Sequence, residues 1–148
     1  MAEHVWTVLC RQVLFDSDGV ISLVNVTDKL VIPDEIKQEL VKARQEDLKG
    51  VFVHLRLHLI SWWTRSDLSK PEMLDGRVSI INPSGEIVNQ QAVTADLKEF
   101  LGHRIDLGFE EFPITGLGPH HFRIEQKRKS KGNRTQWKIE AKIPLLIV

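Results

Sequence analysis

Two histidines and an arginine alternate with apolar residues in the stretch V-F-V-H-L-R-L-H-L-I-S-W-W, residues 51–63. His54 and His58 are four residues apart, with Arg56 between them. On a helix this spacing would bring two imidazoles together on one face, which is metal-binding geometry. On a strand the two Cα atoms lie roughly 13 Å apart, because each residue adds about 3.3 Å, and no single metal ion could be shared. The alternation of leucines favours a strand, so we expect His54, Arg56 and His58 on an outward polar face that can contribute to binding.

A second candidate is the basic run K-R-K-S-K-G-N-R, residues 127–134, with Lys129 and Lys131 near its centre. Lysines and arginines in such a run could contact phosphates of a nucleic acid. Gly132 and Asn133 also fit the turn of a solvated hairpin, and no aromatic residue lies within the run for base stacking. Because the formal net charge of the chain is zero, we expect a solvated hairpin tip, with nucleic-acid binding as an alternative.

The adjacent tryptophans Trp62 and Trp63 come directly after the alternating segment. They could close the end of the core, or one of them could stand exposed as an anchor for a protein partner. The sequence leaves both interpretations open. We expect the following residues, 61–76, to form a long polar connection, and connections of this length are often functional or mobile.

The remaining reactive residue types do not form a recognisable catalytic or metal site. Cys10 is the only cysteine, so no internal disulfide can form, and we expect it to be buried in the first strand. The sequence D-S-D-G, residues 16–19, lacks the further acidic ligands of a calcium loop and is typical of a hairpin turn. In G-L-G-P-H-H, residues 116–121, the third glycine of a dinucleotide motif is missing, and adjacent histidines on a strand point to opposite faces. We therefore predict no catalytic residue, no metal and no cofactor.

The composition is that of a globular protein. In 148 residues, 42% hydrophobic and 27% charged content favour one folded domain, residues 1–148. No signal peptide is recognisable at the N-terminus, and no apolar run approaches the ~20 residues that span a bilayer. We expect a cytoplasmic protein without a membrane partner.

Turn residues and apolar periodicity predict an antiparallel β-sandwich of about eight strands with one short helix. The helix is expected over 33–49, between Pro33 and Gly50. Hairpins are expected around residues 16–19, over 77–88 and at the C-terminal end, and a helical turn is expected within 94–102. In the last strand we expect five residues to face the core: Trp137, Ile139, Ala141, Ile143 and Leu145.

The order of these features resembles a family of small bacterial all-β proteins described as a domain of unknown function. The segments that carry the resemblance are V-L-C, D-S-D-G-V-I-S-L-V-N-V, V-F-V-H-L-R-L, N-P-S-G-E, G-L-G-P-H-H-F-R-I and W-K-I-E-A-K-I-P-L. The resemblance implies a β-sandwich with no assigned activity, and it implies no catalytic residues.

The leading functional prediction is a non-enzymatic binding or interaction module that acts through a sheet face or through the loops at one end. Its partner would be a protein of unknown identity, and edge strands that pair between copies would give a homo-oligomer. One alternative is a metal- or ligand-dependent enzyme with histidines from different strands. The other is nucleic-acid binding through the hairpin of residues 127–134, against which the neutral charge argues.

Overall fold

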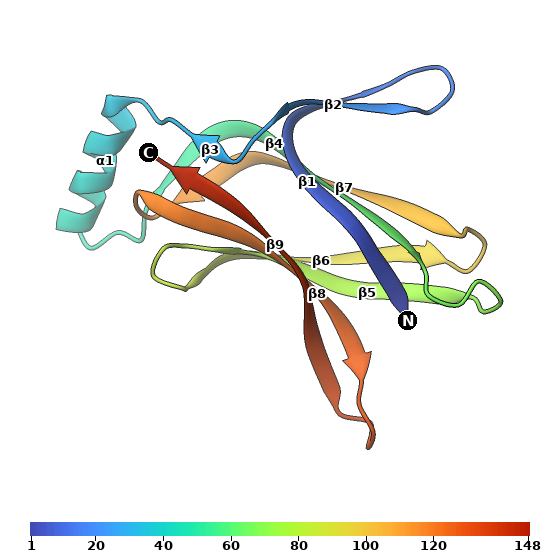
Figure 1. Ribbon diagram of the computed structural model, residues 1–148. Coiled ribbons are helices and arrows are strands. Elements are labelled where there is room, and N and C mark those ends of the chain that lie inside the picture. The colour runs from blue at the N-terminus through green and yellow to red at the C-terminus, as the bar shows by residue number, and fades with distance from the viewer.

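Nine strands in two sheets and one helix make up the computed structural model, which describes residues 1–148 (Figure 1). The first sheet has the strand order β2-β1-β4-β7 and the second the order β3-β9-β8-β5-β6. All neighbouring strands are antiparallel except β3 and β9. The predicted β-sandwich is therefore confirmed. The first sheet consists of Ile21–Val26 (β2), Ala2–Phe15 (β1), Val51–Arg65 (β4) and Gly102–Ile114 (β7), and the second of Lys29–Leu30 (β3), Thr135–Ile147 (β9), Gly118–Lys129 (β8), Glu72–Ile81 (β5) and Ile87–Leu97 (β6).

The core lies between the two sheets and contains a cluster of 21 buried residues. The alternation that predicted a strand at residues 51–60 supplies one side of it, because Leu57 and Leu59 of β4 are buried there. Phe109 and Phe112 of β7 meet Phe122 of β8 across the core, with ring centroids 5.5 and 6.1 Å from the Phe122 ring. Tilted aromatic contacts at such distances stabilise the packing beyond the area they bury.

The single helix, α1 (Asp34–Gln45), covers one end of the sandwich (Figure 1). It begins after Pro33, whose extended backbone and missing N–H suit a helix start. Two acidic residues in its first turn interact favourably with the positive end of the helix dipole. Leu40 and Ala43 are its buried residues. The helix predicted over 33–49 is confirmed, although it ends earlier than expected, at Gln45. With 12 residues, it is not a helix that could cross a membrane.

The long polar connection expected over residues 61–76 is wrong. β4 continues to Arg65 and β5 starts at Glu72, so that only residues 66–71 connect them. Ser61 pairs with both β1 and β7, and it accepts a hydrogen bond from the indole Nε1 of Trp63 at 3.0 Å. The polar residues beyond Trp63 therefore continue the strand, because their backbone groups are paired and their side chains find partners.

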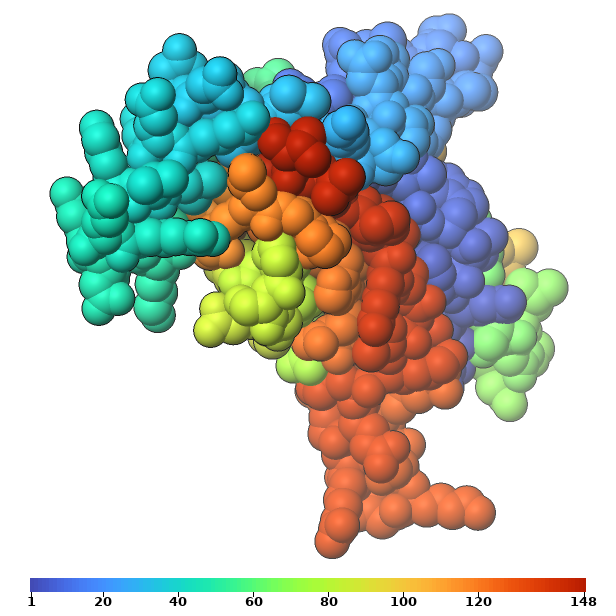
Figure 2. Space-filling model, turned by 60° about the vertical axis from the view of Figure 1, so that its left-hand side comes forward, coloured from blue at the N-terminus to red at the C-terminus, as the bar shows by residue number.

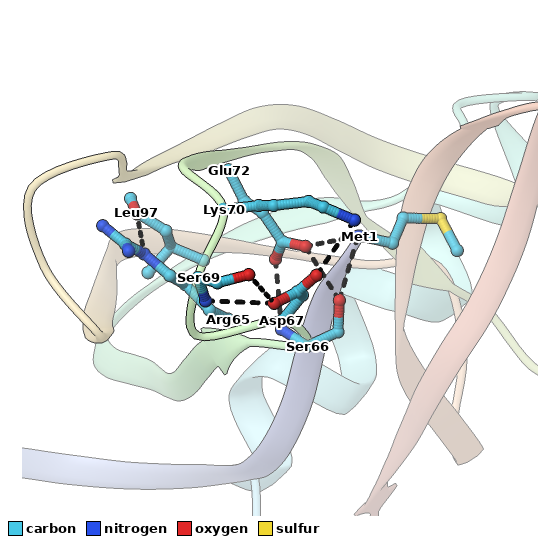
Figure 3. A network of polar contacts seen from close by, with 8 residues as sticks. All are labelled: Met1, Arg65, Ser66, Asp67, Ser69, Lys70, Glu72 and Leu97. Carbon is cyan, nitrogen blue, oxygen red and sulfur yellow. Dashed lines mark hydrogen bonds and ion pairs between the residues drawn. The ribbon is translucent and has the colours of Figure 1, made fainter.

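The short 66–71 connection is held by polar contacts at both ends (Figure 3). The Glu72 carboxylate accepts hydrogen bonds from the Met1 amino group at 2.5 Å and from the Ser66 amide and hydroxyl at 3.1 and 2.8 Å. These bonds outweigh the effect of burial, which alone would raise the pKa of Glu72, and they hold that pKa below its ordinary value. Asp67 accepts from the amide and hydroxyl of Ser69, and the Arg65 guanidinium donates to the Leu97 and Lys98 carbonyls. These local bonds define the course of the connection.

Two further local expectations are corrected. The helical turn expected within 94–102 is absent, since β6 runs to Leu97 and a short turn leads into β7. In β9 a register shift opposite Ile124 and Glu125 changes which residues face inward. As a result the inward positions expected for Trp137 and Ile139 are wrong. Trp137 is half-buried and stacks on Arg77 outside the core cluster. Ile139 is 45% exposed, whereas the side chain of Glu140 is only 10% exposed. A bulge adds one residue to a strand and reverses the side-chain alternation beyond it, and periodicity alone does not reveal it.

We expect the substitution Trp63→Ala to destabilise the protein by roughly 3–5 kcal/mol, because it empties a fully buried site in the core. The measurement is the free energy of unfolding from a urea titration. The matched control is Phe100→Ala, since Phe100 is 60% exposed and its loss should change stability by only about 0.5 kcal/mol. Equal losses in the two variants would contradict the assignment of Trp63 to the core.

Candidate functional site

The two adjacent tryptophans are separated by the strand on which they lie. Trp63 is 1% exposed and faces the core, where His4 packs against its ring at a centroid distance of 5.0 Å. Trp62 lies on the opposite face and is half-buried. Its ring covers Gly102 so closely that a Cβ at that position would collide with it. Neither tryptophan stands free as an anchor, so a partner site must be sought elsewhere.

The polar residues of β4 do lie on the outer face of the first sheet, as the alternation predicts. His54 and Arg56 are exposed, and the His54 imidazole is 3.7 Å from the Glu111 carboxylate. His58 is half-buried, with its Nδ1 atom 2.9 Å from Asp106 Oδ1 on β7. The two histidines do not meet, and each faces an acidic residue of the neighbouring strand. No group of three or more His, Cys, Asp or Glu side chains is close enough to hold a metal ion.

A small hollow of about 320 Å³ lies beside His58. It forms where the pairing of β4 and β7 shifts between His54 and Leu57, so that Arg56 and Glu110 are left around it. The His58–Asp106 pair could orient an imidazole nitrogen for proton transfer or for a hydrogen bond to a ligand. The hollow is lined by no hydroxyl or thiol group that such an imidazole could activate.

Cys10 lies opposite His58 in the pairing of β1 and β4, yet it is fully buried. Burial raises the pKa of the Cys10 thiol, and the nearby Asp106 charge raises that pKa further. The thiol is thus covered and protonated, as expected for a structural cysteine.

Beyond Cys10, β1 pairs only with β2, and the two strands form a hairpin. Phe15 of this hairpin lies 5.3 Å from the Arg104 guanidinium of β7.

The basic run forms a projecting hairpin, which we call the basic arm and define as residues 127–137. In Figures 1 and 2 it extends away from the body of the molecule. β5 pairs with β8 only as far as Gln126, so within the arm β8 pairs with β9 alone. Lys129 and Lys131 are exposed near its tip, as predicted. The turn is closed by hydrogen bonds between Ser130 and Arg134.

An ion-pair cluster holds the base of the basic arm. The Glu125 carboxylate accepts hydrogen bonds from Arg77 Nε at 2.8 Å and Nη2 at 3.2 Å. Burial would raise the pKa of Glu125, but the bonds from Arg77 and the charge of Arg123 outweigh it and hold the pKa below its ordinary value. The Arg77 guanidinium in turn lies 4.1 Å above the ring of Trp137. Trp137, the one aromatic residue of β9, is therefore packed on a cation that Glu125 holds in place.

A larger groove of about 700 Å³ opens at the helix end of the sandwich. We call it the end groove, and it is lined by residues 48–52, residues 86–88, Pro113 and Thr115. Leu48, Phe52 and Ile87 are 57, 71 and 51% exposed. In Figure 2 the segments after α1 and the β5–β6 turn lie on the same end of the molecule. An apolar hollow of this size is within the range of binding sites.

The walls of the end groove are held by Asn82, which is only 5% exposed. Its side-chain oxygen accepts hydrogen bonds from the Ser84 and Glu86 amides at 3.1 and 2.9 Å, which fixes the β5–β6 turn. Its side-chain nitrogen donates to Thr115 Oγ1 at 3.1 Å, which ties that turn to the end of β7. The sequence N-P-S-G-E indicated the turn, but the contact with Thr115 joins residues 33 positions apart and has no local signal.

Gly50 allows the other wall to approach the end of β7. Its backbone is so close to Ile114 that an added Cβ would overlap the Ile114 carbonyl oxygen. The sequence marked Gly50 as a helix stop, whereas the structure shows that it is also the point of closest approach between two segments of the groove. Because the obstructing atom belongs to the backbone, a larger residue requires the strands to move apart.

We expect Gly50→Ala to destabilise the protein by about 1–3 kcal/mol, since the new methyl group meets a backbone oxygen. The measurement is the midpoint and slope of chemical unfolding. Gly108→Ala is the control, because the nearest atom to its added Cβ would be the His58 ring carbon at 4.0 Å. A Gly50→Ala variant as stable as Gly108→Ala would disprove the close approach at the end groove.

We expect the stability that Glu125 contributes to disappear at acid pH. Its folded pKa lies below the ordinary value of 4.5, so its contribution is complete above pH 4.5 and is lost as the pH falls through the folded pKa. Glu125→Gln should lower stability at pH 7 by roughly 2–3 kcal/mol, because Arg77 and Arg123 lose their counter-charge. The variant should then lose less stability than wild type between about pH 5 and about pH 3. Glu110→Gln, on an exposed carboxylate, serves as the control. Parallel pH profiles for Glu125→Gln and wild type would contradict the assignment.

Comparisons of the chain with protein-family models, with curated proteins and with solved structures found no match. The resemblance to the bacterial domain of unknown function therefore depends on the quoted segments alone. The sequence predicted the exposed polar residues of β4 and the basic tip, and the structure places them on separate surfaces. It did not indicate the end groove, whose walls come from three segments far apart in the chain.

Proposed function

We propose that the protein is a non-enzymatic binding module that holds an apolar segment of a protein partner in its end groove. The observation that supports this proposal most is the convergence of Leu48, Phe52 and Ile87, all more than half exposed, on one groove of about 700 Å³. Each of these side chains would gain roughly 1.5–3 kcal/mol if a partner removed it fully from water. Exposed apolar residues are ordinary when they are scattered, but their grouping around a hollow is typical of an interaction surface.

The shape of the end groove favours a polypeptide over a small molecule. Small-molecule sites bury most of the ligand surface, whereas the three apolar side chains that converge on this groove remain more than half exposed to solvent. Lys49 and Glu86 are exposed beside them and place both charge signs at the edge. An apolar centre with a charged rim is the usual composition of a protein interface. The bonds of Asn82 hold the walls in place before binding, which lowers the entropic cost of association.

We expect a peptide selected from a random library against the wild-type protein to carry apolar residues and to lose affinity for Phe52→Ala/Ile87→Ala by roughly 10–100-fold. The measurement is the dissociation constant from fluorescence anisotropy of the labelled peptide. Each variant is first checked for an unchanged unfolding midpoint, which should hold because both side chains are largely exposed.

The matched control removes the same kind of side chain elsewhere. Phe100 and Leu101 are 60 and 59% exposed in the turn between β6 and β7, at a distance along both strands from the end groove. Phe100→Ala/Leu101→Ala should leave peptide affinity within about twofold of wild type. If this control loses affinity as strongly as the groove variant, or if selection yields no peptide that depends on Phe52, the proposal is wrong. Sedimentation at rising concentration shows whether a second copy of the chain occupies the groove instead.

A further inference from the structure

We propose that the basic arm, residues 127–137, is a second and separate binding element that contacts the phosphate backbone of double-stranded DNA. This inference goes beyond the proposed function, because the arm and the end groove share no residue. It develops the alternative that the sequence left open for residues 127–134. Three features of the arm support it: its free position, its charge and the way in which its base is fixed.

The free position follows from the pairing of the strands. Within the arm, Lys127, Arg128 and Lys129 of β8 pair with residues 137 to 135 of β9, and neither strand has another neighbour there. Three residue pairs at about 3.3 Å each, followed by the turn, give a ribbon that extends about 10 Å from the sheet before the turn begins. Figure 2 shows this ribbon projecting from the body of the molecule.

The charge of the arm differs sharply from that of the remaining chain. Residues 127–137 contain five basic and no acidic residues. The whole chain has 20 of each, so the rest has 15 basic and 20 acidic residues and a net charge of −5. The neutral total therefore does not argue against an anionic partner, since the positive charge is collected on one projection.

Only the basic residues near the body are paired. Lys127 lies 3.2 Å from Asp75, and Arg128 lies 3.2 Å from Glu140. Lys129, Lys131 and Arg134 have no acidic partner within 4.0 Å and are exposed around the turn. The tip thus carries three free cations.

The base of the arm is rigid enough to keep the tip in a defined position. Trp137 packs beneath the Arg77 guanidinium at 4.1 Å, and Arg77 donates two hydrogen bonds to the Glu125 carboxylate. The ion pairs of Lys127 and Arg128 join the arm to β5 and β9. These contacts lie at the base of the arm and fix the direction in which the ribbon leaves the sheet.

The form of the arm favours duplex DNA among anionic partners. A two-stranded β-ribbon fits the major groove of B-DNA, which is about 12 Å wide, and the groove of an RNA duplex is too narrow for it. Single strands are bound by stacking on aromatic side chains, and the one aromatic residue of the arm, Trp137, is packed beneath Arg77 at its base. Residues 127–136 contain no large apolar side chain that could insert into a lipid surface.

The test is the binding of a fluorescent 20-base-pair DNA duplex of arbitrary sequence to the full chain, measured by anisotropy at several salt concentrations. With three free cations on phosphates, affinity should fall about 40-fold between 50 and 200 mM salt. Lys129→Gln/Lys131→Gln should bind more weakly and lose about two thirds of the salt dependence. Lys129→Glu/Lys131→Glu should lose at least about tenfold in affinity at the lower salt concentration.

The control is Lys29→Glu/Lys98→Glu, which makes the same change in net charge at two exposed lysines outside the arm. It should retain duplex binding within about threefold of wild type, apart from the general effect of charge. Equal losses in the arm and control variants would overturn the proposal, as would absence of duplex binding at 50 mM salt. Stronger binding to a single strand of the same length would also overturn it. So would stronger binding to vesicles with about 30% phosphatidylserine, an anionic lipid that attracts basic segments. Unchanged unfolding midpoints separate loss of binding from loss of fold.

Discussion

Phe109 and Phe112 are both buried although they are three residues apart in β7, and this requirement shapes much of the molecule. A regular strand would place one of them in solvent, so β7 must change its facing between them. It does so opposite the shift in pairing between His54 and Leu57 of β4. Both rings then reach Phe122 in the second sheet. The same shift leaves Arg56 and Glu110 beside the small hollow, and beyond it β7 continues to Ile114, which closely approaches Gly50 at the end groove.

The end groove and the basic arm both depend on how the strands are placed in the two sheets. The start of β4, the end of β7 and the β5–β6 turn lie together and form the apolar groove. In the second sheet, the pairing of β8 with β5 ends at Gln126, and from there the chain continues as the basic arm. One surface is apolar and partly enclosed, whereas the other is charged and fully open. The two surfaces suit different chemical classes of partner, and a single chain could engage both at once because they share no residue.

Much of the fold could be predicted from the sequence because its signals are local. Leucines at alternate positions identify β4, Pro33 and Gly50 enclose the helix, and Asp-Gly and N-P-S-G-E mark turns. The errors arose where contacts between distant segments determine the ends and bulges of the strands. Residues 61–65 look like a polar connection, yet their backbone is paired on both sides, and the bulges in β4 and β9 have no local sequence signal. The end groove could not be predicted for the same reason, since Phe52 and Pro113 meet through the pairing of β4 with β7, and Ile87 joins them only when the second sheet packs on the first.

Within the basic arm β8 and β9 pair only with each other, and this makes the arm a place where the polypeptide chain can be cut. The strands of the body are held by pairing that does not include the turn at residues 130–134, because up to Gln126 β8 is paired with β9 from Gly118 and with β5 from His121. A protease that cuts after lysine or arginine would find its most accessible sites at that turn. Cleavage there would break the chain into two pieces that stay associated through the core. The tip of the arm is therefore a place where the chain can be opened, or its ends relocated, while the sandwich keeps its structure.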